Sequence, residues 1–549
     1  MSKKSKPLKG ILGLPKKAER QVFVFGRFAE ELPSDDSDDV DFTILEGDED
    51  KDKRQKNTKT RKSGKKAKSK TVSSNYNGEE EKSKKKKRYV QNDSRQTASC
   101  KRTKMVPSTD SKDMPVTTKQ LNQTRNDTSV SPSISSGWTE LIPTEILLLI
   151  FQNVIKSISG SSVPFLCKMS RVCRRWREVA IEPVLWRNVD LSTSCVIKAS
   201  SGTIEKLAPS RLTAVTELSL LGWEKLTDKG IQAIGKHCKQ LQSIVLAQCG
   251  SLTSAGIATL ADNCGQLKMI DVAFTKIDIA SLQHLVKVLG CQLENLSLRN
   301  CNRLHGESIL PLVQEHCPNL ISLDLSSTSV RKLCVEKLQA GCPKLKHLFL
   351  VNLLLTSTPI CKTLVNGKKP NGFTELETLG LPCGFVGSDQ RTDRLLDRIL
   401  WASRNLKMLD IRGPNRYSHD GLRRLPASSL EQLYFTNSAS FSKVAAIVEK
   451  WHHSLEVLDL SQNKNVEDED MELLENFGMP KLHTLDLNNT NITALGLKRV
   501  LNGCPNLTDL NLSSCRGLPR GIKQRHQGEG VLKLPQRLVE SEQISSDSE

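Results

Sequence analysis

The sequence is poor in aromatic residues, has no long apolar run and contains none of the common catalytic motifs. Only 4% of its 549 residues are Phe, Trp or Tyr. The apolar run from Ile146 to Phe151 is far shorter than the roughly 18 residues that a membrane-spanning helix needs. No glycine-rich phosphate loop, paired catalytic carboxylates or nucleophile motif is recognisable. We therefore expect no membrane span, no catalysis and no cofactor.

The cysteines lack the spacing of a metal or redox site. Sixteen are present, but no two form a Cys-x-x-Cys pair. No signal peptide is recognisable, so we expect no disulfide framework. Nine of them instead recur at fixed distances from a ladder of leucines: Cys238, Cys249, Cys264, Cys291, Cys301, Cys317, Cys342, Cys504 and Cys515. This recurrence predicts small buried thiols at the corners of a repeated unit and no metal site.

That ladder has the pattern Leu-x-x-Leu-x-Leu and covers more than half of the chain. Its first positions are Val215, Leu241, Leu267, Leu293, Leu320, Leu345, Leu376, Leu406, Leu430, Leu455, Leu482 and Leu507. The spacing of about 26 to 27 residues is typical of leucine-rich repeats. In an extended strand the last two leucines of a unit, such as Leu458 and Leu460, point to one face. One strand and one short helix cannot bury that face alone, so stacked units predict an α/β solenoid, a leucine-rich-repeat horseshoe.

Ahead of the ladder, the apolar spacing changes to that of helices. A first helix is expected to begin at Pro143, because proline is favoured at the first helical position. Its apolar positions are Ile146, Leu147, Ile150 and Phe151. After a polar break, a second stripe contains Phe165, Leu166, Met169, Val172, Cys173 and Trp176, and a third piece contains Pro183, Leu185 and Trp186. About fifty residues in three short helices form a small core, which suggests that a partner covers part of the apolar surface.

These helices resemble the F-box motif. The matching positions are Leu141, Pro143, Ile146, Leu147, Ile150, Phe151, Val172, Cys173, Trp176, Pro183, Leu185 and Trp186. The resemblance implies binding of the adaptor Skp1, and through it of a cullin and a RING subunit. The residues that it assigns to Skp1 binding are Leu141, Pro143, Ile146, Leu147, Ile150, Phe151, Val172, Cys173, Trp176 and Trp186. The sequence departs from the motif in having Ile142 before Pro143 and a longer break from Lys156 to Pro164. The alternative is an unrelated helical cap on the solenoid.

The F-box pattern followed by cysteine-type repeats, with CPNL at Cys317 and Cys504, resembles the F-box and leucine-rich-repeat protein family. The resemblance implies a non-catalytic substrate receptor of a Skp1-cullin-F-box ubiquitin ligase. The expected domains are a disordered basic tail at 1–134, an F-box at 135–190, 12 or 13 repeats at 191–515, and a C-terminal cap and tail at 516–549. Trp186, Val189 and Leu191 have the spacing of a ladder strand, so we expect the F-box to supply the first strand without a flexible linker.

A protein substrate is expected on the concave side of the repeats, where residues that flank the core leucines point. The candidates combine an apolar patch with an acidic stripe: Phe349, Val351, Asp410, Tyr434, Asp459, Asp486 and Asp509. They predict binding of a basic, partly apolar segment. The alternative is that Leu-Asp-Leu is ordinary repeat consensus. Two longer repeats predict inserted loops near residues 356–371 and 384–393, which form a second candidate site.

The first 137 residues carry much of the positive charge, with 32 Lys and Arg against 20 Asp and Glu. Blocks of one charge with few aromatics predict disorder. The basic run from Lys82 to Arg88 predicts nuclear import, with residence in the nucleus, the cytoplasm or both, although such a run can also be a solvated segment. The competing function is a nuclear repeat scaffold without ligase function, whose tail contacts nucleic acid. We expect such contact to be at most weak and nonspecific, because no aromatics interleave the basic run.

Overall fold

The computed structural model describes residues 142–192, 198–360, 371–381, 384–385, 391–413, 417–436 and 441–546. These residues all belong to one compact unit. The basic tail, Leu141, residues 361–370 of the first expected inserted loop and residues 386–390 of the second lie outside the described residues. Within the described part of the chain, no helix is long and apolar enough to cross a membrane.

The F-box region forms three helices and a 3-10 turn: α2 (Thr144–Ser157), α3 (Val163–Met169), α4 (Arg174–Ala180) and η2 (Pro183–Trp186). Pro143 occupies the N-cap position of α2, so this helix begins one residue later than expected. Pro164 lies in the first turn of α3, where a missing N–H costs nothing. The core of the module contains Phe151, whose ring makes edge contacts with Phe165 and Trp176 at centroid distances of 5.5 and 5.3 Å.

The repeats build one sheet of fourteen strands in which neighbours follow the chain order. The strands are β1 (Asn188–Asp190), β2 (Glu217–Ser219), β3 (Ser243–Val245), β4 (Met269–Asp271), β5 (Asn295–Ser297), β6 (Ser322–Asp324), β7 (His347–Phe349), β9 (Thr378–Gly380), β11 (Met408–Asp410), β12 (Gln432–Tyr434), β13 (Val457–Asp459), β14 (Thr484–Asp486), β15 (Asp509–Asn511) and β16 (Arg525–Gln527). All pairs are parallel except the last, in which β16 runs antiparallel to β15. The twelve ladder positions correspond to β2–β7, β9 and β11–β15.

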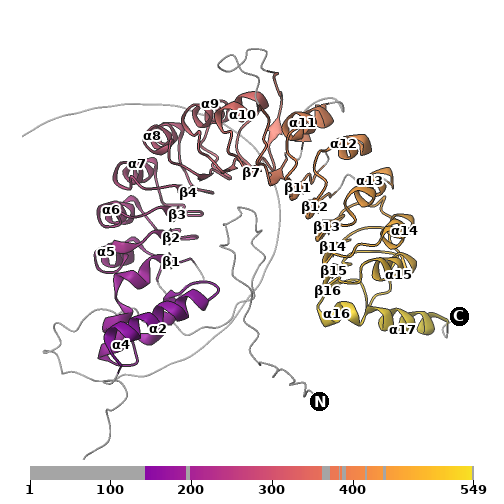
Figure 1. Ribbon diagram of the computed structural model, residues 1–549, viewed down its shortest axis with the longest axis horizontal. Coiled ribbons are helices and arrows are strands. Elements are labelled where there is room, and N and C mark those ends of the chain that lie inside the picture. The colour runs from indigo at the N-terminus through magenta and orange to yellow at the C-terminus, as the bar shows by residue number, and fades with distance from the viewer. Residues whose placement is uncertain are drawn as a thin grey trace, which may run out of the picture. The chain divides into compact units, whose positions relative to one another are not determined.

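Helices return the chain between strands, and they lie on the outer side of the arc while the strands line the inner side (Figure 1). They are α5 (Ser201–Ser210), α6 (Asp228–His237), α7 (Ser254–Asn263), α8 (Ile279–Leu289), α9 (Gly306–His316), α10 (Val335–Gly341), α11 (Arg391–Leu400), α12 (His419–Arg424), α13 (Phe441–Trp451), α14 (Asp468–Phe477) and α15 (Ala494–Gly503), with a short η3 (Leu212–Ala214). After β16 come α16 (Glu529–Leu532) and α17 (Leu534–Ser546). The predicted fold, a helical F-box fused to a leucine-rich-repeat solenoid, is confirmed.

Eight of the nine recurring cysteines are buried, as the repeat pattern predicts. Burial raises the pKa of thiols such as Cys238 and Cys317 to about 12, so they stay protonated at neutral pH. Cys291 is exposed, which corrects the expectation for that position. It lies two residues before its leucine instead of three, and this change of register takes its side chain out of the repeat corner.

The two long repeats form a second, small sheet. In it β8 (Leu354–Leu355) pairs in parallel with β10 (Gly384–Phe385). Residues 361–370 of the first expected loop lie outside the described residues. The second expected loop, 384–393, is not entirely a loop, because it begins with β10 and ends in the first turn of α11.

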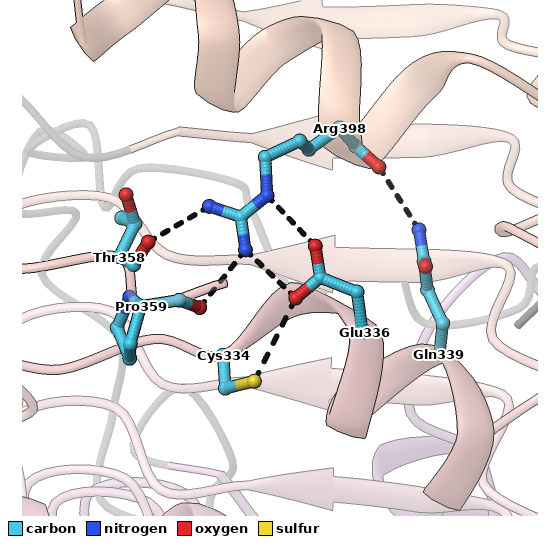
Figure 2. A network of polar contacts seen from close by, with 6 residues as sticks. All are labelled: Cys334, Glu336, Gln339, Thr358, Pro359 and Arg398. Carbon is cyan, nitrogen blue, oxygen red and sulfur yellow. Dashed lines mark hydrogen bonds and ion pairs between the residues drawn. The ribbon is translucent and has the colours of Figure 1, made fainter. Parts of the chain in front are cut away.

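The guanidinium group of Arg398 binds the chain at Thr358 and Pro359, just before the first inserted segment (Figure 2). It donates to both carboxylate oxygens of Glu336 at 2.8 and 2.7 Å, and to the carbonyl oxygens of Thr358 and Pro359 at 2.8 and 3.0 Å. Its own backbone carbonyl accepts from Gln339 at 3.0 Å. The Arg398 and Glu336 side chains are only 19% and 20% exposed. One arginine of α11 thus joins the first turn of α10 to the chain that enters the insertion.

Replacing Arg398 with alanine is expected to lower the free energy of unfolding by about 2 kcal/mol, because a mostly buried carboxylate and two carbonyls lose their donor. Urea unfolding followed by circular dichroism measures this. Arg423→Ala is the matched control, since its pair with Glu449 is about half exposed and should contribute less than about 1 kcal/mol. Equal losses in the two variants would show that the Arg398 contacts have no special role.

Candidate functional site

Several large apolar side chains of the F-box are exposed in the part of the chain that the structure describes. On α2, Ile146, Leu149 and Ile150 are 47%, 51% and 44% exposed, and Val172 after α3 is 53% exposed. Residues three and four apart lie on the same side of a helix, so the three α2 side chains form one apolar surface. We call these four residues the open face. Leu149 was not among the predicted adaptor residues, although its spacing from Ile146 is the signal that could have identified it.

The other predicted adaptor residues lie elsewhere in the module. Leu147, Phe151 and Trp186 are in its core, at 3%, 1% and 1% exposure. Cys173 and Trp176 are half-buried, Pro143 is exposed at the start of α2, and Leu141 lies outside the described residues. The core residues therefore position the open face and do not form part of it.

The orientation of α2 is fixed by contacts with α4. The Arg175 guanidinium donates to the carbonyl oxygen of Ile142 and, at 3.4 Å, to the hydroxyl of Thr144. The thiol of Cys173 accepts a hydrogen bond from the backbone N–H of Trp176 at 3.5 Å and caps α4. These polar contacts satisfy backbone groups at two helix ends and hold the open face in a defined orientation.

The end of the F-box supplies the first strand of the sheet, as its strand-like spacing predicts, and residues 193–197 after that strand lie outside the described residues. The indole N–H of Trp186 donates to the carbonyl of Ala180 at 2.9 Å. Two residues later β1 begins, and Val189 pairs with Leu218 of β2. The indole of Trp223 donates to the carbonyl of Leu191 just after that strand. The open face and the first repeats therefore belong to one packed structure.

On the concave side, several predicted substrate carboxylates have a local role. Asp410, Asp459 and Asp486 each end a strand and accept a hydrogen bond from the backbone N–H two residues later, at 3.2, 2.9 and 2.9 Å. This bond stabilises the turn after the strand, as Asx turns do. The alternative interpretation of these residues as repeat consensus thus has a physical basis.

Two of the predicted substrate residues are covered by the protein itself. Phe349 and Asp410 are only 4% and 3% exposed, and Asp410 also forms a bidentate ion pair with Arg412. The Arg412 guanidinium lies 5.2 Å from the centre of the Tyr434 ring, which is half-buried beneath it. Asp509 pairs with Arg525 and Gln527 of β16. Burial acts to raise the pKa of Asp509, but these hydrogen bonds prevail and lower it.

Asp459 and Asp486 are the carboxylates best placed for a partner. They are paired in register on β13 and β14 and are both half-buried on the concave side, and Val351, in the turn just after β7, is also half-buried. Burial and the nearby Asp486 charge raise the pKa of Asp459, against the hydrogen bond from Ser461. Asp486 also accepts from the Asn511 amide at 2.9 Å. A cation bound between the two carboxylates would relieve their mutual repulsion.

Comparisons with known proteins match both parts of the chain. The F-box-like family model matches residues 139–192, and a Leucine Rich repeat model matches residues 452–474 and 478–500. The DNA repair protein rhp7 of Schizosaccharomyces pombe is 28% identical over 50% of this chain and 48% of its own length. F-box/LRR-repeat protein 4 of Bos taurus is 21% identical over 42% of this chain and 40% of its own. The chain thus spans about half, or less, of these curated relatives. The yeast Rad7 and Elc1 complex contains a chain that is 15% identical, with a TM-score of 0.46 over 69% of this chain and 90% of that one.

Proposed function

We propose that this chain, which is an F-box and leucine-rich-repeat protein, is the substrate-recognition subunit of a Skp1-cullin-F-box ubiquitin ligase. The observation that carries the proposal is the open face, Ile146, Leu149, Ile150 and Val172. The module is small and packs its other apolar side chains into its own core. Four large apolar side chains left exposed on it are typical of a surface that a protein partner covers. In this proposal Skp1 covers the open face and links the chain to the cullin and RING subunits, which supply the ligase activity.

The repeats would then hold the substrate on their concave side. The pair Asp459 and Asp486, with the apolar Val351 in the turn after β7, supports a basic and partly apolar segment as the substrate. The basic run at residues 82–88 supports nuclear import, which would place the complex in the nucleus for at least part of the time.

A capture experiment with purified Skp1 tests the adaptor contact. The variant Ile146→Asp/Ile150→Asp puts two charges into the open face and should weaken capture at least about tenfold, because unpaired carboxylates would be buried against the partner. Leu147 is unsuitable for this test, since its removal would disturb the core. The variant Val288→Asp/Leu495→Asp is the matched control, because these side chains are 49% and 53% exposed on α8 and α15.

The outcomes separate the functions under consideration. Capture by the wild type and the control, but not by the open-face variant, supports the receptor function. Capture by all three proteins would show that Skp1 binds a surface other than the open face. No capture by a well-folded wild type would make the helices a solenoid cap and would favour the nuclear scaffold that contacts nucleic acid weakly.

A further inference from the structure

A cavity of about 460 Å³ lies where the F-box meets the first strand of the sheet. Its walls come from the last turns of α2, from the loop at 158–162 and from the segment 184–188. That loop belongs to the break that is longer than the F-box motif, and it turns at Gly160, whose φ of +121° favours glycine. The volume lies within the range of about 300–1,000 Å³ that small-molecule sites occupy. The extra loop residues thus form one wall of a cavity of ligand size.

The lining combines an aliphatic wall with positive charge. The aliphatic side chains are Ile155, Ile158, Val184 and Leu185. Lys156 and Arg187 also line the cavity, and no carboxylate does. In the described part of the chain, neither cation has a side-chain hydrogen bond or an ion pair. The amides of Gln152 and Asn188 add further donors. An apolar wall with a few converging donors is the usual composition of a small-molecule site.

Ser162 supplies an independent sign of a missing partner. It lines the cavity and is only 5% exposed, and within the described residues its hydroxyl oxygen has no hydrogen-bond partner. A buried hydroxyl without a partner costs free energy. Donation to an acceptor in the cavity requires the Ser162 side chain to rotate about its Cα–Cβ bond to another staggered position, because its oxygen is buried in the present one.

We propose that this cavity binds a compact organic anion. The aliphatic wall covers the apolar body of the ligand, while Lys156 and Arg187 bind its phosphate or carboxylate group and Ser162 donates to it. The proposed site uses no contact with the adaptor or the substrate. A failure to bind the anion would therefore leave the proposed receptor function unaffected.

Isothermal titration of the full chain at physiological salt tests the site with four probes: phenyl phosphate, benzoate, inorganic phosphate and benzyl alcohol. Saturable binding of phenyl phosphate or benzoate is expected, and the stronger of the two identifies the anionic group. Inorganic phosphate and the neutral alcohol should bind at least about tenfold more weakly, because the first lacks an apolar body and the second lacks an anionic group.

Three variants separate the site from general attraction of anions to a basic chain. Lys156→Gln/Arg187→Gln should weaken binding at least about tenfold, whereas Lys168→Gln/Arg171→Gln, exposed in the same module but outside the cavity, should not change it. Ser162→Ala should weaken binding while raising the melting temperature, since it removes an unsatisfied hydroxyl. The proposal is overturned if neither organic anion binds saturably, if both double variants lose binding equally, or if inorganic phosphate binds as tightly as phenyl phosphate.

Discussion

Replacing Trp186 with alanine is expected to lower the free energy of unfolding by about 3–5 kcal/mol, and to let the F-box unfold before the repeats. Trp186 is only 1% exposed at the point where η2 leads into β1. Its removal leaves a large cavity and takes the indole donor away from the Ala180 carbonyl. A repeat protein is stabilised by contacts between neighbouring units. A weakened junction therefore lets the F-box unfold independently of the repeats. Urea unfolding followed by circular dichroism should therefore change from one transition to two.

Two control variants separate the effect of the lost side-chain volume from the effects of the lost hydrogen bond and of removing a tryptophan. Trp186→Phe retains most of the ring volume and should lose only about 1–2 kcal/mol, which includes the cost of the unpaired carbonyl. Trp401→Ala removes a side chain that is 55% exposed and should change stability by less than about 1 kcal/mol. An unchanged single transition in Trp186→Ala would mean that the junction is held by the β1 and β2 pairing instead.

The repeat ladder was readable from the sequence because its period and its strand register depend on the same residues. Each ladder unit predicts one strand, and Leu458 and Leu460 are both fully buried as expected. The antiparallel strand β16 could not be predicted in this way. Its three residues, Arg525–Gln527, are charged or polar, and only His526 is buried. Pairing with the edge of β15 stabilises this strand, and no apolar periodicity of its own marks it.

The open face shows where sequence periodicity stops being informative. The run from Ile146 to Phe151 is apolar around the whole circumference of α2, so spacing alone cannot tell the side that faces the core from the side that faces a partner. The structure separates them, with Leu147 and Phe151 inside and Leu149 outside. On the concave side, the strand period predicts only that Asp410 points away from the core leucines. It did not predict that Arg412 would cover the carboxylate, because that contact depends on a local turn.

Asp271→Asn is expected to raise the free energy of unfolding at neutral pH by up to about 3 kcal/mol, and to remove a pH dependence between about pH 4 and pH 6. Burial raises the pKa of Asp271 from 3.8 to about 6; the charge of Asp324 adds to this, while hydrogen bonds from Ala273 and Ser297 and the charge of Arg299 oppose it. The folded state therefore holds this proton more tightly than the unfolded state does. Stability from this group is fully present below about pH 4 and is lost as the pH rises through about 6.

Asparagine can keep the contact that Asp271 makes, since its carbonyl oxygen can accept the backbone N–H of Ala273, now at 2.9 Å from the carboxylate. Urea unfolding of both proteins at pH 4.5, 6 and 7.5 should give curves that diverge as the pH rises. Asp190→Asn is the matched control, because Asp190 accepts the equivalent bond from Ser192 at 3.0 Å but is only half-buried in β1. Divergence of equal size in the control would attribute the effect to the turn and not to the buried charge.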